Sequence, residues 1–272
     1  SQWLAEGDVV PIRSITHNLS LPGVASALRQ LSQARHVGKV VVSCAGGAAS
    51  LSGSASAPAA DDAQLLLSAG VSGPGRIVIM GGTGSLGVLL AGWLASCGAA
   101  CVELLSRSGT LPAAAASALL SAGSRTQLVV RACDAACAED ASHAFSVGDA
   151  PIRAVLHAGG VLADGTLANQ SRASLLRVFA PKLGALGALA FATGAQPLCS
   201  QVLFSSVASL LGSPGQANYS AANAALDAAA QRQWACGLPS VSVQWGAWSG
   251  GGMAMSDAQT VARVERSGIA LI

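Results

Sequence analysis

The segment from Arg76 to Gly87 constrains the fold of this chain more than any other. It begins with Arg76-Ile-Val-Ile-Met80, a β-branched run that predicts a buried strand. Gly81-Gly-Thr-Gly-Ser-Leu-Gly87 follows directly, and a helical pattern then runs from about Ser85 to Cys97. Glycines in this setting permit a tight turn and close backbone approach to a pyrophosphate, which the helix N-terminus then faces. We therefore expect a dinucleotide to be bound by the residues of this turn, Gly82, Thr83, Gly84, Ser85, Leu86 and Gly87.

Strand-like and helical segments alternate through the rest of the chain. Further strands are predicted at 100–105, 128–132, 152–157, 201–204 and 239–245, and long helices at 167–180 and 216–234. Apolar residues make up 51% of the chain and charged residues only 10%, which suits a sheet that is covered on both faces. The pattern predicts an α/β fold, a Rossmann-type doubly wound parallel sheet with helices on both faces.

The end of the second strand bears on the choice of cofactor. An acidic residue at this point would bind the ribose 2′-hydroxyl of NAD, but the chain has Ser106-Arg107-Ser108. A guanidinium between two hydroxyls suits a 2′-phosphate, so NADPH is the expected cofactor. An ordinary solvated surface arginine would give the same sequence, and this alternative stays open.

Two later strand ends complete the expected cofactor site. Asp134 follows the third strand, where it is placed to contact the adenine amino group. Ala158 and Gly159 follow the fourth strand and are small enough for a ribose to lie against the backbone. His157 precedes them and is grouped with the cofactor-contacting residues, with no catalytic role assigned.

The stretch from Gln201 to Asn223 carries the candidate chemistry. Ser206 ends a short strand, where open parallel sheets present their ligands. Tyr219, the only tyrosine in the chain, lies on the following helix, and Asn223 is four residues later on the same face. Lys182 is one of only two lysines, which suggests that an ammonium is specifically required there.

These four side chains suit the reduction of a carbonyl group. A nicotinamide cofactor delivers hydride to the carbonyl carbon, and the oxygen must receive a proton. Tyr219 would donate it, Ser206 would hold the oxygen, and Asn223 would orient Lys182 or a relay water. We expect the Lys182 ammonium to bind the nicotinamide ribose and to lower the pKa of Tyr219 from about 10 toward neutral pH.

The glycine turn, together with Ser206, Tyr219 and Asn223, resembles the short-chain dehydrogenase/reductase superfamily. Most members place Lys four residues after the Tyr, where this chain has Asn223. The ketoreductase domains of modular polyketide synthases and animal-type fatty acid synthases carry Asn there and take their Lys from an earlier helix, a position that Lys182 matches. Further segments similar to this group are 104–109, 155–162, 213–219 and 245–248.

Over residues 75–272, this resemblance implies NADPH-dependent reduction of a β-ketoacyl thioester to the β-hydroxyacyl thioester. The substrate would be tethered to an acyl carrier protein within a multidomain synthase. In this group a Leu-Asp-Asp motif marks enzymes that form the D-hydroxyl product, and a Trp eight residues before the Tyr marks the opposite hand. This chain has Leu162-Ala163-Asp164, and Leu211 at the Trp position, so we expect the D-hydroxyl product. Met253 ends the flexible segment 246–253, the expected lid over the substrate.

Residues 1–43 form a unit of their own. An amphipathic helix is predicted at 19–34 and a β-type run at 36–43. Gly7-Asp-Val-Val-Pro-Ile12 and His36–Val42 resemble the C-terminal end of an enoyl reductase domain of the medium-chain reductase family. Residues 44–74 have the Ala/Ser/Gly-rich composition of a linker. The chain thus looks like part of a longer synthase, with enoyl reductase and dehydratase domains as expected neighbours.

Composition argues against several other classes of protein. A net charge of +2 provides no basic face for nucleic acid. No continuous apolar run reaches the roughly 18 residues that span a bilayer. The seven cysteines lack the spacing of a zinc site, so we expect no metal and interpret them as reduced thiols of a cytoplasmic protein.

Two other functions remain compatible with the sequence. The chain could be a stand-alone short-chain reductase that acts on a small ketone, although the N-terminal unit and linker argue against this. It could also be a non-catalytic, nucleotide-binding or structural domain. Binding of NADPH without turnover would distinguish the structural domain from an enzyme.

Overall fold

The computed structural model describes residues 15–18, 26, 40–43, 74–121, 125–148, 150–193 and 198–248. The chain divides into two compact units, Ser1–Ala57 and Pro58–Ile272. In the first unit, strands β1 (Ile15–Asn18) and β2 (Val40–Ser43) pair in parallel. β2 lies within the β-type run predicted at 36–43, whereas β1 was not predicted. The predicted helix at 19–34 lies almost wholly outside the described residues.

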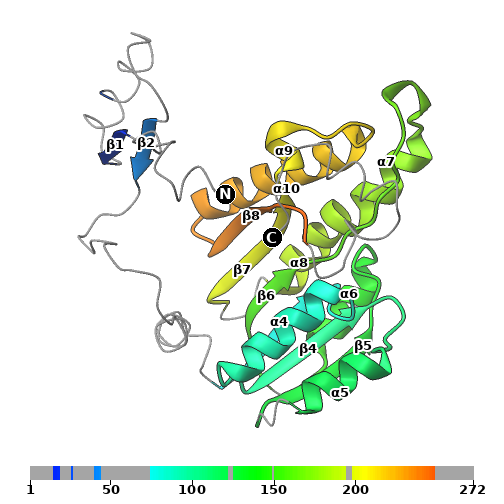
Figure 1. Cartoon of the computed structure of the whole chain (residues 1–272). Helices are drawn as coiled ribbons and strands as arrows, with labels where there is room; N and C mark the ends of the chain where they lie inside the picture. The colour runs from blue at the N-terminus through cyan, green and yellow to red at the C-terminus, as the bar shows by residue number, and fades with distance from the viewer. Residues whose placement is uncertain are drawn as a thin grey trace, which may run out of the picture. The chain divides into compact units, whose positions relative to one another are not determined.

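The second unit is built on six parallel strands. In chain order they are β3 (Arg76–Met80), β4 (Cys101–Ser106), β5 (Gln127–Ala132), β6 (Ile152–His157), β7 (Ser200–Ser206) and β8 (Ser240–Trp245). Their order across the sheet is β5-β4-β3-β6-β7-β8, which confirms the doubly wound parallel sheet (Figure 1). The order reverses between β3 and β6, and ligands bind at such a switch point because the connecting loops diverge there.

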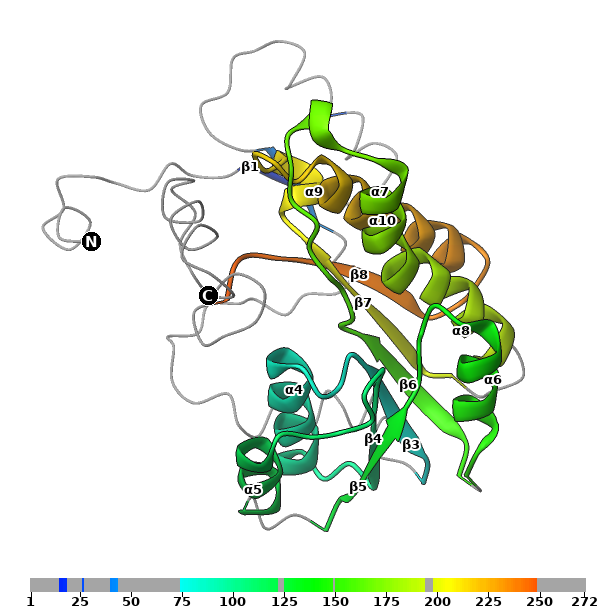
Figure 2. The ribbon, with the colours of Figure 1, turned by 90° about the vertical axis from the view of Figure 1, so that its right-hand side faces the viewer.

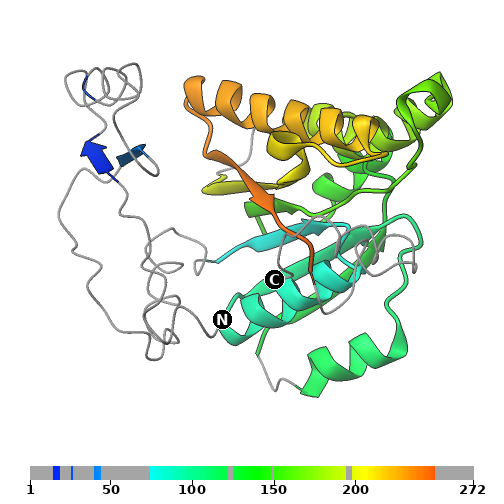
Figure 3. The same cartoon turned by 45° about the horizontal axis from the view of Figure 1, so that its top comes forward.

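Helices cover both faces of this sheet. α4 (Ser85–Ser96) and α5 (Ala113–Ser121) lie on one face (Figure 2). The other face carries α6 (Ala138–Ser146), α7 (Arg172–Phe179), α8 (Ala185–Thr193) and α10 (Ala217–Ala235), with α10 beside β7 and β8 (Figure 3). Two short helices, η1 (Leu167–Asn169) and α9 (Ala208–Leu211), lie in the loops after β6 and β7.

The core consists of two apolar layers separated by the sheet. All five residues of β3 are buried, as the β-branched run predicted. Ile77 and Ile79 pack in the layer under α4 and α5, whereas Val78 and Met80 pack in the layer under α6, α8 and α10. The alternation follows from the two-residue period of a strand, and it anchors the glycine turn that β3 leads into.

A π-helical segment, η2 (Ala180–Gly184), interrupts the helix that was predicted at 167–180. The backbone forms η1 and α7, then η2, and continues as α8. Pro181 has no backbone N–H to donate, and the N–H of Ala185 bonds back to the Ala180 carbonyl. Single π turns occur often at functional sites, and this one turns Lys182 inward to only 2% exposure.

By length and composition, one helical stretch among the described residues, Arg172–Ala190, could cross a membrane. Its mean hydropathy is 1.3, and a third of it (33%) is buried inside the protein. Within this stretch, α7 packs against α10 and α8 packs against α6. This is the arrangement of an internal helix of an α/β domain.

Candidate active site

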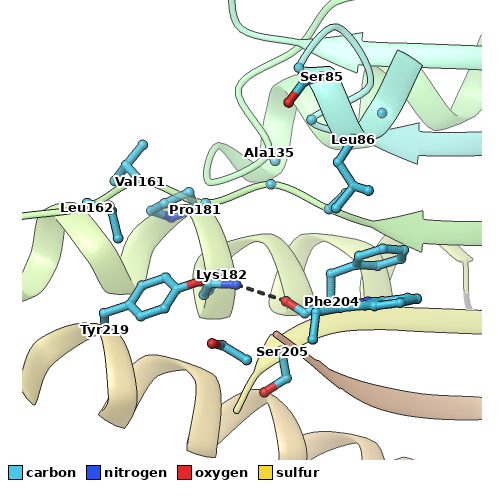
Figure 4. A pocket seen from close by; sticks show the side chains of 18 of the residues that line it. Ser85, Leu86, Ala135, Val161, Leu162, Pro181, Lys182, Phe204, Ser205 and Tyr219 are labelled. Atoms are coloured by element: carbon cyan, nitrogen blue, oxygen red, sulfur yellow. Dashed lines mark hydrogen bonds between the residues drawn. The ribbon is translucent and has the colours of Figure 1, made fainter. Parts of the chain in front are cut away.

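A cleft of about 1140 Å³ opens at the carboxyl edge of the sheet, over the switch point. It is lined by the glycine turn, the ends of β4 to β8, the η2 segment and the start of α10 (Figure 4). The predicted site residues that line it are Thr83, Gly84, Ser85, Leu86, Gly87, Ser106, Arg107, Asp134, Ala158, Gly159, Lys182, Ser206 and Tyr219. Gly82, Ser108, His157, Asp164, Leu211 and Asn223 are not among the lining residues, and Met253 lies outside the described residues.

The glycine turn is shaped by close backbone packing. A Cβ on Gly82 would stand 2.7 Å from the Ile79 carbonyl oxygen, and one on Gly87 would stand 2.5 Å from Gly82 Cα. Gly84 is the N-cap of α4, where no side chain caps the helix and the first turn holds no acidic residue. The N-terminal N–H groups of α4 are therefore available to an anionic group, and this backbone fits a pyrophosphate.

Ser106, which ends β4, and Ser108 place their hydroxyls on either side of Arg107 in a tight turn. The Ser106 hydroxyl accepts a hydrogen bond from the Gly109 N–H at 3.2 Å, and the Ser108 hydroxyl accepts one from Thr110 at 3.4 Å. Arg107 lines the cleft, and neither of the two ion pairs among the described residues involves it. Glu103, the acidic residue of β4, is instead buried between Arg76 and Arg131.

Asp134 has a structural contact that the sequence did not indicate. Its Oδ1 accepts a hydrogen bond from the Ala136 N–H at 3.0 Å, and its own N–H donates to Asp140 Oδ2 at 3.1 Å. The carboxylate thereby holds the turn between β5 and α6 at the cleft. It still has a second oxygen to offer an adenine amino group.

The wall after β6 consists of small residues in front of a buried histidine. Ala158 and Gly159 line the cleft, and a Cβ on Gly159 would stand 3.2 Å from His157 Cε1. His157 is fully buried, and burial together with the Lys182 charge lowers its pKa to about 3. Its imidazole is therefore neutral at physiological pH, and it supports the wall from behind.

Lys182 is a buried cation that reaches the cleft from η2. Its Nζ donates a hydrogen bond to the Phe204 carbonyl oxygen at 3.0 Å (Figure 4). Burial lowers the pKa of Lys182 from 10.5 to about 8, and the charge of Asp227 acts in the opposite direction. The side chain thus remains mostly an ammonium at neutral pH.

Tyr219 lies beside this ammonium at the start of α10. Lys182 Nζ is 5.7 Å from the centroid of the tyrosine ring, and the hydroxyl points toward Lys182 (Figure 4). Burial raises the pKa of Tyr219, whereas hydrogen bonding by Asn223 and Ser206 lowers it. The net direction is upward, so the expected lowering is wrong for the protein alone. The physical reason is desolvation of the phenolate, which the sequence could not show.

Asn223 lies one turn after Tyr219 on α10, and of its two predicted partners the structure shows no hydrogen bond to Lys182 among the described residues. It is fully buried, and its Nδ2 donates to the Tyr219 carbonyl oxygen at 2.8 Å. Within the described part of the chain its Oδ1 has no hydrogen-bond partner. Asn223 therefore fixes the turn of α10 that carries Tyr219, and its free acceptor is available to a water molecule.

Two polar side chains that the sequence analysis missed fix the loop around Asp164. Gln216 Nε2 donates to both carboxylate oxygens of Asp164, at 3.2 and 3.3 Å. Asn218 Nδ2 donates to the Ala163 carbonyl oxygen at 2.7 Å. Both residues are buried and lie within the three positions before Tyr219. Polar residues this close to the only tyrosine were the sequence feature that could have indicated these contacts. Leu211, in contrast, is 66% exposed on α9.

The sequence analysis also missed an aromatic wall. The rings of Phe204 and Trp245 stack at 5.4 Å, and Trp248 packs on Trp245 at 5.1 Å. All three residues line the cleft on the side of β7 and β8. Phe204, Trp245 and Leu86 belong to one apolar cluster, so the aromatic wall lies next to the glycine turn.

Comparison with known proteins places this geometry in a family. A family model described as the KR domain matches residues 75–250. The chain is 43% identical over 217 residues to polyketide synthase GfsB of Streptomyces halstedii, an alignment that covers 78% of this chain and 4% of that synthase. It is 37% identical over 243 residues to the phthioceranic/hydroxyphthioceranic acid synthase of Mycobacterium tuberculosis, covering 88% of this chain and 11% of that synthase. The chain thus spans a small part of these relatives.

Solved structures give the same grouping. The A-type ketoreductases from a modular polyketide synthase superpose with a TM-score of 0.68 at 37% identity, over 73% of this chain and 42% of theirs. The first ketoreductase of the tylosin polyketide synthase superposes with a TM-score of 0.65 at 36% identity, over 73% of this chain and 43% of its own.

Proposed function

The chain belongs to the KR family, the ketoreductase domains of polyketide synthases within the short-chain dehydrogenase/reductase superfamily, and on that basis we propose that it reduces a β-ketoacyl thioester to a β-hydroxyacyl thioester. The acyl chain is carried by an acyl carrier protein, and NADPH is the reductant. The observation that supports this most directly is the meeting of Lys182 and Tyr219 in a cleft that also contains the glycine turn.

Residues that line the cleft suit NADPH. The pyrophosphate would lie against the glycine turn and the N-terminus of α4, where no side chain competes for the N–H groups. Arg107 is free of ion pairs among the described residues and would bind the 2′-phosphate between Ser106 and Ser108. When bound, NADPH supplies hydride to the carbonyl carbon.

Four side chains stabilise the charge and transfer the proton. Tyr219 keeps its hydroxyl proton at neutral pH because its pKa is raised, and it donates that proton to the carbonyl oxygen. The Ser206 hydroxyl binds the same oxygen and stabilises its developing charge. The Lys182 ammonium stabilises the tyrosinate that forms and binds the cofactor ribose. The Oδ1 of Asn223, which has no hydrogen-bond partner among the described residues, would hold a water molecule that returns a proton.

The loop at Asp164 supports a proposal for the hand of the product. That carboxylate is held by Gln216 three residues before Tyr219, so the loop is fixed beside the proton donor. Leu211 points to solvent and offers no aromatic ring to the cleft. We propose the D-hydroxyl product on these grounds, with Met253 as part of the lid.

We further propose that the chain is one region of a cytoplasmic multidomain synthase. Residues 75–272 would form the reductase domain, 44–74 a linker, and 1–43 the end of a preceding enoyl-reductase-like domain. Its partners would then be the acyl carrier protein and neighbouring enoyl reductase and dehydratase domains. The small share of each relative that the chain covers supports this organisation.

Turnover of a simple thioester tests the proposed function. We expect the protein to consume NADPH when given a β-ketoacyl N-acetylcysteamine thioester, and Tyr219→Phe to lower kcat by about a hundredfold or more, since it lacks the proton donor. The absorbance of NADPH reports the rate, and chiral chromatography of the product reports its hand. Tight NADPH binding without turnover would instead indicate a non-catalytic domain, and equal rates in both proteins would contradict the role of Tyr219.

A further inference from the structure

Asp227 connects three elements around the site, and nothing in the reaction described above uses it. It follows Tyr219 and Asn223 on α10 at the same spacing of four residues, so all three lie on one face of the helix. Its Oδ1 accepts a hydrogen bond from the Ser242 hydroxyl at 2.6 Å. Its Oδ2 is 2.7 Å from the Ser209 hydroxyl and 2.8 Å from Gln244 Nε2. The carboxylate thereby joins α10 to α9 and to β8.

This cluster fixes the turn that carries Ser206. The Ser209 hydroxyl lies 2.8 Å from the Ser206 carbonyl oxygen, and Gln244 Nε2 lies 2.9 Å from the Ser209 oxygen. The turn is also held by the N–H of Val207, which donates to the Trp245 carbonyl oxygen at 3.0 Å. The Ser206 hydroxyl accepts a hydrogen bond from the Ala208 N–H at 3.2 Å within this turn, so the placement of Ser206 is linked to Asp227 through the backbone of the turn.

The same carboxylate lies in the neighbourhood of Lys182. The Phe204 carbonyl that accepts from Lys182 is followed by Ser205, whose hydroxyl donates to the Asn223 carbonyl oxygen at 3.3 Å, one helical turn before Asp227. Neither of the two ion pairs among the described residues includes Lys182, and its Nζ donates to a neutral carbonyl. Of the titratable side chains near it, His157 is neutral because its pKa is lowered, and Tyr219 is neutral because its pKa is raised. Asp164 acts on Tyr219, whereas Asp227 opposes the fall in the pKa of Lys182.

Asp227 itself stays ionised. Burial alone would raise the pKa of its carboxyl group, but hydrogen bonds from Ser242, Gln244, Ser209 and Ser205 together hold the pKa below its ordinary value. The charge is therefore present throughout the range in which Lys182 titrates.

We propose that Asp227 is a positioning residue with two effects: it orients Ser206 through Ser209, and its charge keeps the buried Lys182 in its ammonium form. This inference rests on the proposed function for the role of Ser206. The effect on Lys182 does not depend on turnover, so the two can be tested separately.

The first test titrates Lys182 directly. The chain contains only two lysines, Lys39 and Lys182, so lysine labelled at the ε-carbon gives two NMR signals, one of which is an internal reference. We expect Asp227→Asn to move the titration midpoint of Lys182 to lower pH by roughly half a unit or more. Asp227→Glu, which keeps the charge, should stay near wild type, as should Glu139→Gln, an exposed acid on α6. An unmoved midpoint in Asp227→Asn would overturn the charge effect.

The second test measures turnover as a function of pH. We expect Asp227→Asn to lower kcat by about tenfold, since it disturbs the placement of Ser206, and to move the basic limb of kcat/KM to lower pH. Ser242→Ala removes one hydrogen bond but keeps the charge, so kcat should fall by about threefold with the basic limb unmoved. If Asp227→Asn and Asp227→Glu lower kcat equally and share the same pH profile, the charge of Asp227 has no effect and the residue is purely structural. Absence of turnover in wild type would contradict the proposed function, and the titration would then decide the charge effect alone.

Discussion

At the level of single residues, burial of the Lys182 charge lowers the stability of the folded protein while it places a cation in the site. Lys182 is 2% exposed, and the one hydrogen bond of its ammonium within the described part of the chain goes to the Phe204 carbonyl oxygen. In the folded protein the pKa of Lys182 is about 8, whereas the ordinary pKa of a lysine is 10.5. Between these pH values the unfolded chain binds more protons than the folded protein, so the stability of the folded protein rises with pH through this window.

Replacement of Lys182 should therefore stabilise an inactive protein. At pH 7 the lowered pKa corresponds to about 3 kcal/mol of unfavourable free energy. Lys182→Met removes this cost but leaves the Phe204 carbonyl without its donor, so we expect a net gain of about 1–2 kcal/mol. Thermal unfolding should show a Tm higher by a few degrees at pH 7 and little difference at pH 10, with turnover lost. A variant less stable than wild type at pH 7 would contradict the assignment of Lys182 as a destabilising charge.

At the level of elements, the glycine turn depends on backbone contacts that a single methyl group would break. A Cβ on Gly87 would meet Gly82 Cα at 2.5 Å, and neither backbone segment can give way easily. On the same helix, a Cβ on Gly92 would meet Leu119 Cδ2 at 3.5 Å, an ordinary contact.

Gly87→Ala and Gly92→Ala therefore form a matched pair. We expect Gly87→Ala to raise the Kd for NADPH by at least about tenfold, because the turn must open to admit the methyl group. Gly92→Ala should leave Kd unchanged and add about 0.5–1 kcal/mol of stability, since alanine favours a helix interior. Fluorescence titration of NADPH measures both. Similar affinities in the two variants would show that the turn does not hold the cofactor.

The elements also show which parts of the structure the sequence could reveal. Strands with dense β-branched runs, such as Arg76–Met80 and Ile152–His157, were predicted to the residue. α5 and α8 were not predicted, because their alanine-rich segments carry little amphipathic pattern. α6 was not predicted either, although Ala141, Ala144 and Phe145 give it a buried face. The η2 turn was not predicted either, since it depends on Pro181 and on packing around Lys182. The site was predicted as a set of residues, but burial, which raises the pKa of Tyr219, depends on tertiary structure.

At the level of the whole molecule, the family model and the solved relatives confirm the expected ketoreductase family and Rossmann-type fold. The cleft collects residues from both halves of the sheet, from Gly81 at one end to Trp248 at the other. A ligand that spans the cleft contacts both halves at once, and so it must stabilise the fold of this unit.

Thermal unfolding with two cofactors tests this consequence and the cofactor preference together. At about 100 times its Kd, NADPH should add about 2.7 kcal/mol to the free energy of unfolding. NADH at the same concentration should add less, because it lacks the 2′-phosphate. We expect Arg107→Ala to reduce the shift in Tm with NADPH and to leave the shift with NADH unchanged. Equal shifts with both cofactors in wild type would contradict the preference for NADPH.

The acceptor that holds the Lys182 ammonium is a main-chain oxygen, and this determines which substitutions leave that hydrogen bond intact. Every residue type carries that oxygen, so substitution at position 204 cannot delete it while β7 keeps its register. The ring of Phe204, in contrast, belongs to the aromatic wall with Trp245 and Trp248. A library that randomises these three wall positions therefore changes the lining of the cleft, while every member keeps the main-chain oxygen that holds the cation.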